Sequence, residues 1–181
     1  PHHYIDGAWV PPSNPGVRDM VDPATEAVFA RVANGGTAED VDRAVVAARH
    51  AFADFSHTSV KDRVAMIDRI IAAYEKRMDD FTEVLASEVG VPVSARAQVT
   101  GPIGHMKVAR DLLKSYSFET RMDDTIIRRE PIGVCALIAP WNWPVQTPVI
   151  KFIYALASGC TSIMKGSDAS PLSSILLTEV I

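Results

Sequence analysis

Residues 131–168 read PIGVCALIAPWNWPVQTPVIKFIYALASGCTSIMKGSD, and this stretch decides the fold of the chain. It begins with a continuous apolar run, Val134 to Ala139, which ends before a proline. A helix-length segment follows from about Val145 to Ser158, and a second apolar run, Thr161 to Met164, ends at Lys165. Two short apolar runs on either side of a helical segment are typical of a strand–helix–strand unit, whose two strands are parallel.

Parallel sheets bind their ligands at the carboxyl ends of the strands, so these ends are the first place to look for a site. Here they carry Asn142, in the turn after the first run, and Lys165, at the end of the second run. We expect an α/β fold, the start of a doubly wound and mainly parallel sheet with helices on both faces. The sequence predicts an N-terminal hairpin and a layer of helices before this sheet.

The rest of the chain is read from turn signals and from helical periodicity. The Asp6-Gly7 pair predicts a hairpin within residues 4–10. Thr37 and Ser59 each precede an aspartate by three residues, which is the spacing of a helix N-cap. The remaining elements that we expect are strands at 20–21 and 28–32, a helix at 81–89, a helix over 94–118 that is kinked or restarted at Pro102, an exposed strand at 125–129 and a helix over 171–181.

Composition excludes several classes of function. The chain has 181 residues, of which 48% are hydrophobic and 22% charged, as in a globular domain with a sizeable core. The net charge of −4 gives no reason to expect nucleic acid or an anionic membrane as partner. No apolar run is long enough to span a membrane, and the first residues do not resemble a secretory signal. Two distant cysteines predict neither a disulfide framework nor a metal site, and we expect a cytoplasmic protein.

Several motifs in this chain resemble those of the aldehyde dehydrogenase superfamily. They are PIGV, PWN, Lys151, YALASGC and KGSD in the central stretch, with YIDGAWV, DPATEAVFARV and SEVGVP upstream. The resemblance covers nearly all of this chain but well under half of a complete family member. It implies that residues 1–181 are the amino-terminal part of the NAD-binding domain, that residues 119–131 form an oligomerisation arm, and that the catalytic domain lies outside this chain.

The resemblance assigns two residues to catalysis. Asn142 corresponds to the amide that helps to hold the oxyanion of the thiohemiacetal, and such a donor is worth about 3–4 kcal/mol of barrier. From the residues alone, a cap on the helix that follows is the favoured role of Asn142. Lys151 matches a lysine assigned to proton relay in some members, and otherwise it is a solvated charge on a helix.

The resemblance also assigns cofactor contacts. Ile138, Ala139, Pro140 and Trp141 resemble the residues on the nicotinamide side, and Lys165 resembles the lysine that binds the adenosine ribose. Asp168 stands where the family usually has Glu.

A carboxylate beside the ribose favours NAD over NADP because it repels a 2′-phosphate, although NADP is not excluded. The alternative for Lys165 and Asp168 is a solvated turn. Gly166, in place of the usual Pro, should leave this loop more flexible.

Three further residues occupy positions that line the substrate tunnel in family members. They are Trp143, Gln146 and Thr147, which together would make an aromatic-walled and partly polar passage. The alternative is that they are packing residues at the start of the helix, since pocket linings are mostly apolar.

Neither cysteine matches the nucleophile of the family, which lies far downstream, as does its general-base Glu. Cys135 lies inside the first apolar run, and Cys160 stands in the turn where the family usually has Asn. A buried strand cysteine is usually inert, and no base is positioned in sequence to activate either thiol. We therefore expect this fragment alone to be inactive.

The sequence leaves three functional interpretations open. The first is an NAD-dependent aldehyde dehydrogenase, which oxidises an aldehyde to a carboxylic acid through a cysteine thiohemiacetal and assembles as a homodimer or homotetramer. The second is a relative that passes the acyl group to coenzyme A. The third is a non-catalytic, truncated homologue that acts only in assembly, which the departures at Val91, Cys160 and Gly166 favour.

Overall fold

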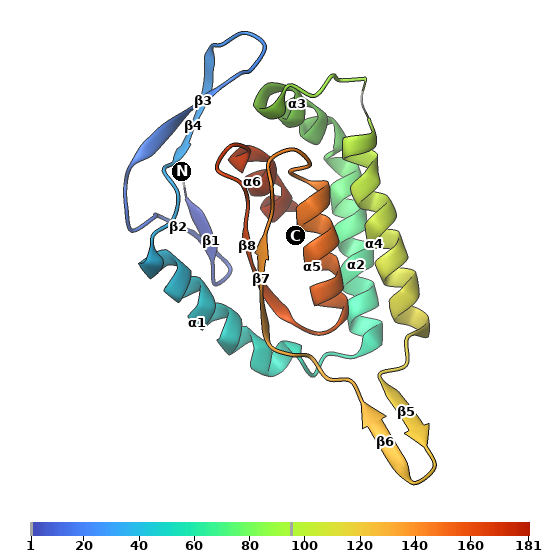
Figure 1. Ribbon diagram of the computed structural model, residues 1–181. Coiled ribbons are helices and arrows are strands. Elements are labelled where there is room, and N and C mark those ends of the chain that lie inside the picture. Colours follow the sequence, from blue (N-terminus) through green and yellow to red (C-terminus); the bar gives the residue numbers. More distant parts are fainter. Residues whose placement is uncertain (1, 95) are drawn as a thin grey trace.

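A computed structural model describes residues 2–94 and 96–181 of the chain (Figure 1). The elements in chain order are β1 (His3–Ile5), β2 (Ala8–Val10), β3 (Val17–Val21), β4 (Val28–Ala33), α1 (Ala38–Phe55), α2 (Val60–Lys76), α3 (Met78–Val89), α4 (Ala97–Ser115), β5 (Glu119–Met122), β6 (Thr125–Arg128), β7 (Val134–Ile138), α5 (Gln146–Ala157), β8 (Thr161–Lys165) and α6 (Pro171–Val180).

The strand–helix–strand unit that the sequence predicts is present. β7 and β8 are paired in parallel, with Val134 opposite Thr161 and Ile138 opposite Lys165, and α5 connects them. The described residues hold this one parallel pair, so the wider doubly wound sheet is represented here by its first two strands.

Helices cover both faces of the β7–β8 pair, because two apolar strands must be buried on each side. Figure 1 shows α1 on one side of the strands, and α5, α2 and α4 in succession on the other. The hydroxyl of Thr161 donates to the carbonyl of Ala48 at 2.8 Å, which joins the start of β8 to α1. The expectation of helices on both faces is confirmed.

The main core lies between the helices on the α5 side. Tyr74 of α2 is fully buried, stacks on Phe81 with ring centroids 4.5 Å apart, and donates its hydroxyl to the carbonyl of Val99 at 3.0 Å. Its hydrogen bond therefore links α2 to α4 in a place where an unpaired polar group would be costly. Other core residues include Ile67, Leu85, Met106, Leu113, Val149, Ile153 and Leu177.

Two antiparallel hairpins precede the helices, as the sequence predicts. In the turn between β1 and β2, Asp6 and Gly7 have φ of 54° and 75°, the left-handed conformation that a two-residue hairpin loop requires. The second hairpin pairs β3 with β4 and contains a register shift between Met20 and Val21.

A buried carboxylate joins the N-terminal segment to α1. Thr37 caps α1 by accepting from the N–H of Asp40, and the Asp40 carboxylate accepts from the N–H of Thr37 at 3.0 Å. The same carboxylate accepts from the N–H of Ser13 at 3.1 Å and from its hydroxyl at 2.8 Å. These hydrogen bonds, led by that of Thr37, outweigh burial and lower the pKa of Asp40 from 3.8 to about 2.

A second buried carboxylate joins α3 to α6. Glu88 accepts from the main-chain N–H groups of Leu172 at 2.5 Å and Ser173 at 3.0 Å, and from the Ser173 hydroxyl. These are free donors in the first turn of α6, where a negative charge is favourable. Burial raises the pKa of Glu88, and the three hydrogen bonds oppose that rise. Glu88 thereby fixes the start of α6 after the β8 loop.

The expectation of a fresh helix start at Pro102 is wrong, whereas a kink there stays a prediction. α4 begins at Ala97 rather than near residue 94, and it runs through Pro102 to Ser115. Pro102 is fully buried in the packed face of α4, so the apolar contacts of the ring hold the helix together despite the missing N–H.

The segment between α4 and β7 is a hairpin rather than a single exposed strand. β5 pairs with β6 in antiparallel fashion, and Asp123 in the turn has a φ of 51°. The hairpin projects away from the rest of the molecule in Figure 1, and all of its strand residues are exposed. Among the residues described, no helix is both long and apolar enough to cross a membrane.

We expect Asp40→Asn to lower the free energy of unfolding near neutral pH by about 1–3 kcal/mol, because an amide cannot accept all the donors that converge on the carboxylate. The pKa of Asp40 is lowered on folding, so its contribution is complete above about 3.8 and is lost as the pH falls towards about 2. Urea unfolding at several pH values should therefore show the difference between the wild type and the variant shrinking over that range.

The matched control is Asp42→Asn, which changes an exposed aspartate of the same helix and should have little effect. A difference between wild type and Asp40→Asn that stays constant down to the lowest pH would contradict the assigned role of the ionised carboxylate.

Candidate functional site

The carboxyl ends of β7 and β8 form one rim of the parallel pair. The main-chain N–H of Ala139 donates to the carbonyl of Lys165 at 3.1 Å, so the two strands end side by side. Lys165 is the last residue of β8, and Asn142 lies in the turn that follows β7. Both residues are exposed. An amide and an ammonium group are therefore available to a ligand that lies along this rim.

The connection from β7 to α5 is an irregular elbow over residues 139–145. Pro140 has no N–H to extend the strand ladder, which ends at Ile138. Ala139 is buried, whereas the side chains of Ile138 and Trp141 are 68% and 56% exposed. The side chains of Ile138, Pro140 and Trp141 are thus open to solvent beside the rim. The resemblance implies that the nicotinamide side of a dinucleotide lies here.

The alternative that Asn142 caps the following helix is wrong. α5 begins at Gln146, its N-cap is Val145, and no side chain makes a capping hydrogen bond there. The two residues that directly precede the helix are Pro144 and Val145, and both are fully buried. The Asn142 side chain is therefore not committed to the helix terminus and is available for a ligand.

The main chain of Asn142 is held by a residue that sequence reasoning missed. The side-chain N–H of Gln98, near the start of α4, donates to the carbonyl of Asn142 at 3.3 Å. The side-chain oxygen of Gln98 is buried and has no partner among the described residues. Only the packing of α4 against the elbow brings these two residues together, so no local pattern in the sequence could have identified Gln98.

Of the three expected tunnel residues, Trp143 lies in the elbow, and Gln146 and Thr147 are the first two residues of α5. Trp143 is 37% exposed, and its carbonyl accepts from the N–H of Thr147 at 3.0 Å. Gln146 is half-buried, and its side-chain oxygen lies so close to Gly101 of α4 that a Cβ there would be 2.4 Å away. Gln146 thus packs against α4, while the Trp143 indole is the more accessible of the two.

Lys165 and Asp168 form an ion pair across the turn after β8. Their nitrogen and oxygen atoms are 2.7 Å apart, and both side chains are largely exposed. The hydrogen bond from Lys165 lowers the pKa of Asp168, and the charge of Arg18 acts in the same direction. Asp168 is thus an ionised acceptor beside a cation, although its side chain is one methylene shorter than that of Glu.

Gly166 has a steric role in the same turn. A Cβ at this position would lie 2.1 Å from the hydroxyl oxygen of Ser174 and 2.8 Å from its Cβ. The turn therefore approaches α6 more closely than any other residue type would allow without a shift. The expectation of greater flexibility at Gly166 stays a prediction, and close packing is a sufficient reason for the glycine.

Comparison with known proteins identifies the family to which this fold and this rim belong. The model of the aldehyde dehydrogenase family matches residues 9–181. The chain belongs to the aldehyde dehydrogenase family. It corresponds to an amino-terminal portion of the family members.

Relatives of known sequence and structure support this assignment. A putative aldehyde dehydrogenase of Staphylococcus aureus is 40% identical over 179 residues, which are 98% of this chain and 38% of the relative. Aldehyde dehydrogenase C of Pseudomonas syringae, in a mutant form in complex with NAD+ and octanal, is 46% identical with a TM-score of 0.96 over 99% of this chain and 37% of that one. A betaine aldehyde dehydrogenase of S. aureus, in complex with NAD+, is 28% identical with a TM-score of 0.91 over 98% of this chain and 37% of that one.

These matches confirm the α/β fold class, and the chain spans well under half the length of these relatives.

In this aldehyde dehydrogenase chain, the two cysteines lie away from the rim. Cys135 is the second residue of β7, and Cys160 directly precedes β8. Both therefore lie towards the amino ends of the strands, whereas Asn142 follows the carboxyl end of β7. At about 3.3 Å per residue, the three residues from Cys135 to Ile138 alone span roughly 10 Å. This separation supports the prediction that neither cysteine is the nucleophile of the family reaction.

Lys151 is exposed on the second turn of α5. Its position is compatible with either of the interpretations drawn from the sequence, a proton relay or a solvated charge. Its role stays a prediction.

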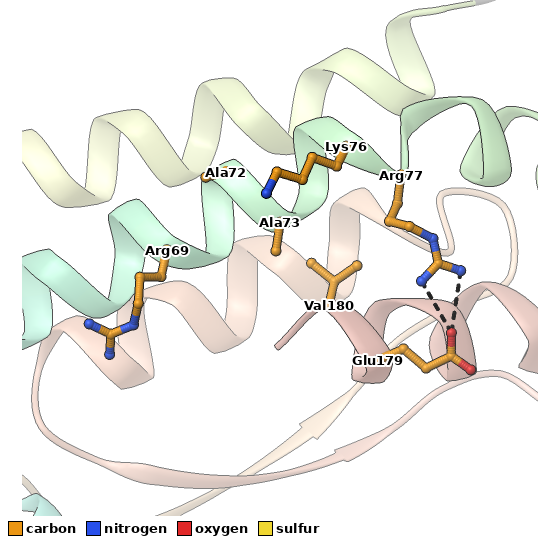
Figure 2. A pocket seen from close by; sticks show the side chains of 7 residues that line it. All are labelled: Arg69, Ala72, Ala73, Lys76, Arg77, Glu179 and Val180. Carbon is orange, nitrogen blue, oxygen red and sulfur yellow. Dashed lines mark hydrogen bonds and ion pairs between the residues drawn. The ribbon is translucent and has the colours of Figure 1, made fainter.

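One surface hollow of the chain lies outside this site. It has a volume of about 450 Å³ and lies between α2 and the end of α6. Arg77 and Glu179 form an ion pair there at 3.3 Å, and Figure 2 shows the pair. Arg69 and Lys76 also line it, and none of the expected site residues does. The hollow is therefore separate from the rim.

Proposed function

We propose that the chain is the amino-terminal part of an NAD-dependent aldehyde dehydrogenase, which oxidises an aldehyde to a carboxylic acid through a cysteine thiohemiacetal. The observation that carries the proposal is the common rim of β7 and β8, with Asn142 beyond one strand and Lys165 at the end of the other. Relatives in complex with NAD+ support it further. In this proposal the nucleophile and the general base come from outside these 181 residues.

Asn142 stabilises the charge that develops when a thiolate adds to the aldehyde carbon. The carbonyl oxygen then becomes an oxyanion, and the amide N–H of Asn142 donates to it more strongly as the charge grows. Gln98 holds the main chain of Asn142 from α4, so the donor is placed before the substrate binds. NAD, when bound, supplies the acceptor for the hydride that leaves the aldehyde carbon.

The residues at the rim fit the ribose of a dinucleotide. The Lys165 ammonium has three N–H donors, of which one is used by Asp168, so two remain for ribose hydroxyls. Asp168 accepts hydrogen bonds and carries a negative charge, which disfavours a 2′-phosphate. We therefore assign NAD as the preferred cofactor, with Ile138, Ala139, Pro140 and Trp141 on the nicotinamide side.

The other assignments rest on the resemblance and on the use of cysteine. Trp143, Gln146 and Thr147 line the substrate passage in this proposal, and Lys151 takes part in proton transfer. We also assign the protein to the cytoplasm, because its two cysteines are both free.

The β5–β6 hairpin is the oligomerisation arm of this proposal, in a homodimer or homotetramer. It projects from the body of the chain and exposes three apolar side chains, Met122, Ile126 and Ile127, by 59%, 59% and 40%. Exposed apolar groups on a projecting hairpin are typical of a surface that pairs with another chain.

We expect residues 1–181 alone to form no NADH with octanal or other aldehydes, because neither cysteine is close to the rim. The full-length protein should form NADH under the same conditions, which absorbance measurements would follow. Turnover by the isolated segment, with its secondary structure verified by circular dichroism, would contradict the requirement for outside residues.

Adding coenzyme A to the full-length assay separates the remaining interpretations. A carboxylic acid as product, with or without coenzyme A, supports the proposal, whereas an acyl-coenzyme A product supports the acylating relative. A full-length protein that binds no NAD in calorimetry would support a role in assembly only.

In the full-length protein, Asn142→Ala should reduce kcat by about 10²–10³-fold with little change in KM, because the lost donor acts mainly in the transition state. The matched control is Asn34→Ala, at an exposed position before α1, which should leave both constants unchanged. If Asn142→Ala raised KM and left kcat intact, the amide would act in substrate binding instead.

Asp168→Asn should shift cofactor preference towards NADP. It removes a negative charge near the ribose and frees Lys165 for a phosphate, so the ratio of kcat/KM for NADP to that for NAD should rise by roughly tenfold or more, which corresponds to about 1.4 kcal/mol. Asp124→Asn, in the exposed turn of the arm, is the charge-matched control. An unchanged ratio would mean that Asp168 does not reach the ribose.

A further inference from the structure

The two cysteines of the chain lie next to each other at the amino ends of β7 and β8. Cys135 is opposite Ser162 in the parallel register, and Cys160 lies two residues before Ser162, so both cysteines are on the same side of the strand pair. The two sulfurs are close enough for the charge of Cys160 to raise the pKa of Cys135. Cys160 is 5% exposed, and Cys135 is half-buried.

Three hydrogen-bond donors act on the thiol of Cys160. The hydroxyl of Ser158 lies 3.5 Å from its sulfur, and the main-chain N–H groups of Ile132 and Gly133 contribute to lowering its pKa. Burial by itself raises the pKa of a thiol, but these donors, together with that of Cys135, outweigh it and lower the pKa of Cys160. For Cys135, burial and the neighbouring sulfur both raise the pKa. The thiol of Cys160 therefore loses its proton more readily than the thiol of Cys135.

A buried cation lies beside the same turn. Arg63 of α2 is only 5% exposed, and its Nη1 packs so tightly on Gly159 that a Cβ there would be 2.3 Å away. Its guanidinium lies over the Phe118 ring at 5.2 Å, and its Nε is buried without a partner among the described residues. No carboxylate is paired with Arg63 in the described part of the chain. Burial lowers the pKa of Arg63, and the charge of the Cys160 sulfur acts in the opposite direction.

We propose that Cys160 is a peroxide-reactive thiolate and that Cys135 is the thiol that resolves it. The Cys160 sulfur attacks one oxygen of a hydroperoxide, breaks the O–O bond and becomes a sulfenic acid, while the other oxygen leaves as water or an alcohol after taking a proton. Cys135 then gives up its proton as its sulfur attacks the sulfenic sulfur. The S–S bond forms, the S–O bond breaks, and the leaving hydroxide takes that proton and becomes water. Two thiols and one peroxide are consumed, and the peroxide is the oxidant.

The position of Cys160 in the chain favours the second step. β8 begins at Thr161, so Cys160 precedes the strand ladder. A movement of Cys160 would break the hydrogen bond from its N–H to the carbonyl of Ala155, at 2.9 Å, but no pair in the sheet. Gly159, with a φ of 84°, adopts a backbone conformation that other residues rarely take, and its closely packed turn would have to shift for the two sulfurs to reach bonding distance. This pair lies at the end of the strands opposite to the rim, so the modification is separate from the proposed oxidation of aldehydes.

The test is peptide mapping of the folded full-length protein after treatment with hydrogen peroxide. Trypsin places Cys135 in the peptide 130–151 and Cys160 in the peptide 152–165, each with a single cysteine. We expect the wild type to give these two peptides linked, lighter by two hydrogen atoms than the two thiol peptides together. In Cys135→Ser, dimedone should instead label Cys160 as the sulfenic acid.

The matched control is Cys160→Ser, in which Cys135 should stay unlabelled by dimedone at the same peroxide concentration. Three results would overturn the proposal: no modification of Cys160 unless the protein is first unfolded, sulfenic acid at Cys160 of the wild type without the linked peptides, or equal labelling of Cys135 in Cys160→Ser. Circular dichroism of both variants before treatment ensures that the comparison is between folded proteins.

Discussion

The structure depends on the parallel pairing of β7 and β8. Parallel strands cannot be joined by a tight turn, so the chain must leave β7, cross over as α5 and return to the start of β8. Because of this crossover, the two ends of the strand pair carry different sets of polar residues. The elbow with Asn142 and the end of β8 with Lys165 share one rim, whereas the turn with Cys160 returns the chain to the opposite end.

Two apolar strands are stable only if both faces are covered, and the rest of the chain provides that cover. α1 takes one face, held at its start by the capped Asp40, and the α5 layer takes the other. Glu88 connects this helical cover to the rim. By capping α6 it fixes the helix against which Gly166 packs, and Gly166 belongs to the turn that carries Lys165 and Asp168. The position of the expected ribose ligands therefore depends on a buried carboxylate in a different layer.

The sequence predicted what is locally encoded. The Asp6-Gly7 turn, the Thr37 cap and the two strands around α5 each follow from a few neighbouring residues. The β5 strand was missed because Glu119–Met122 is short and polar and is specified mainly by its pairing with β6. Gln98 was missed for a related reason, since its bond to the Asn142 carbonyl exists only through the packing of α4 on the elbow. The sequence alone could not decide between capping and ligand binding for Asn142, because that depends on where α5 begins.

The two ends of the strand pair differ in the kind of charge that they stabilise. At the rim, Asn142 and Lys165 are exposed donors, so an anion or an oxyanion must come from a ligand. At the other end the hydroxyl of Ser158 lies 3.5 Å from a sulfur of the chain itself, and the buried cation of Arg63 packs on the adjacent Gly159. A buried cation without a carboxylate partner is costly unless another negative charge compensates it. In our proposal an ionised Cys160 supplies that charge, which would give a physical reason for a cysteine at this turn, where the resemblance leads one to expect Asn.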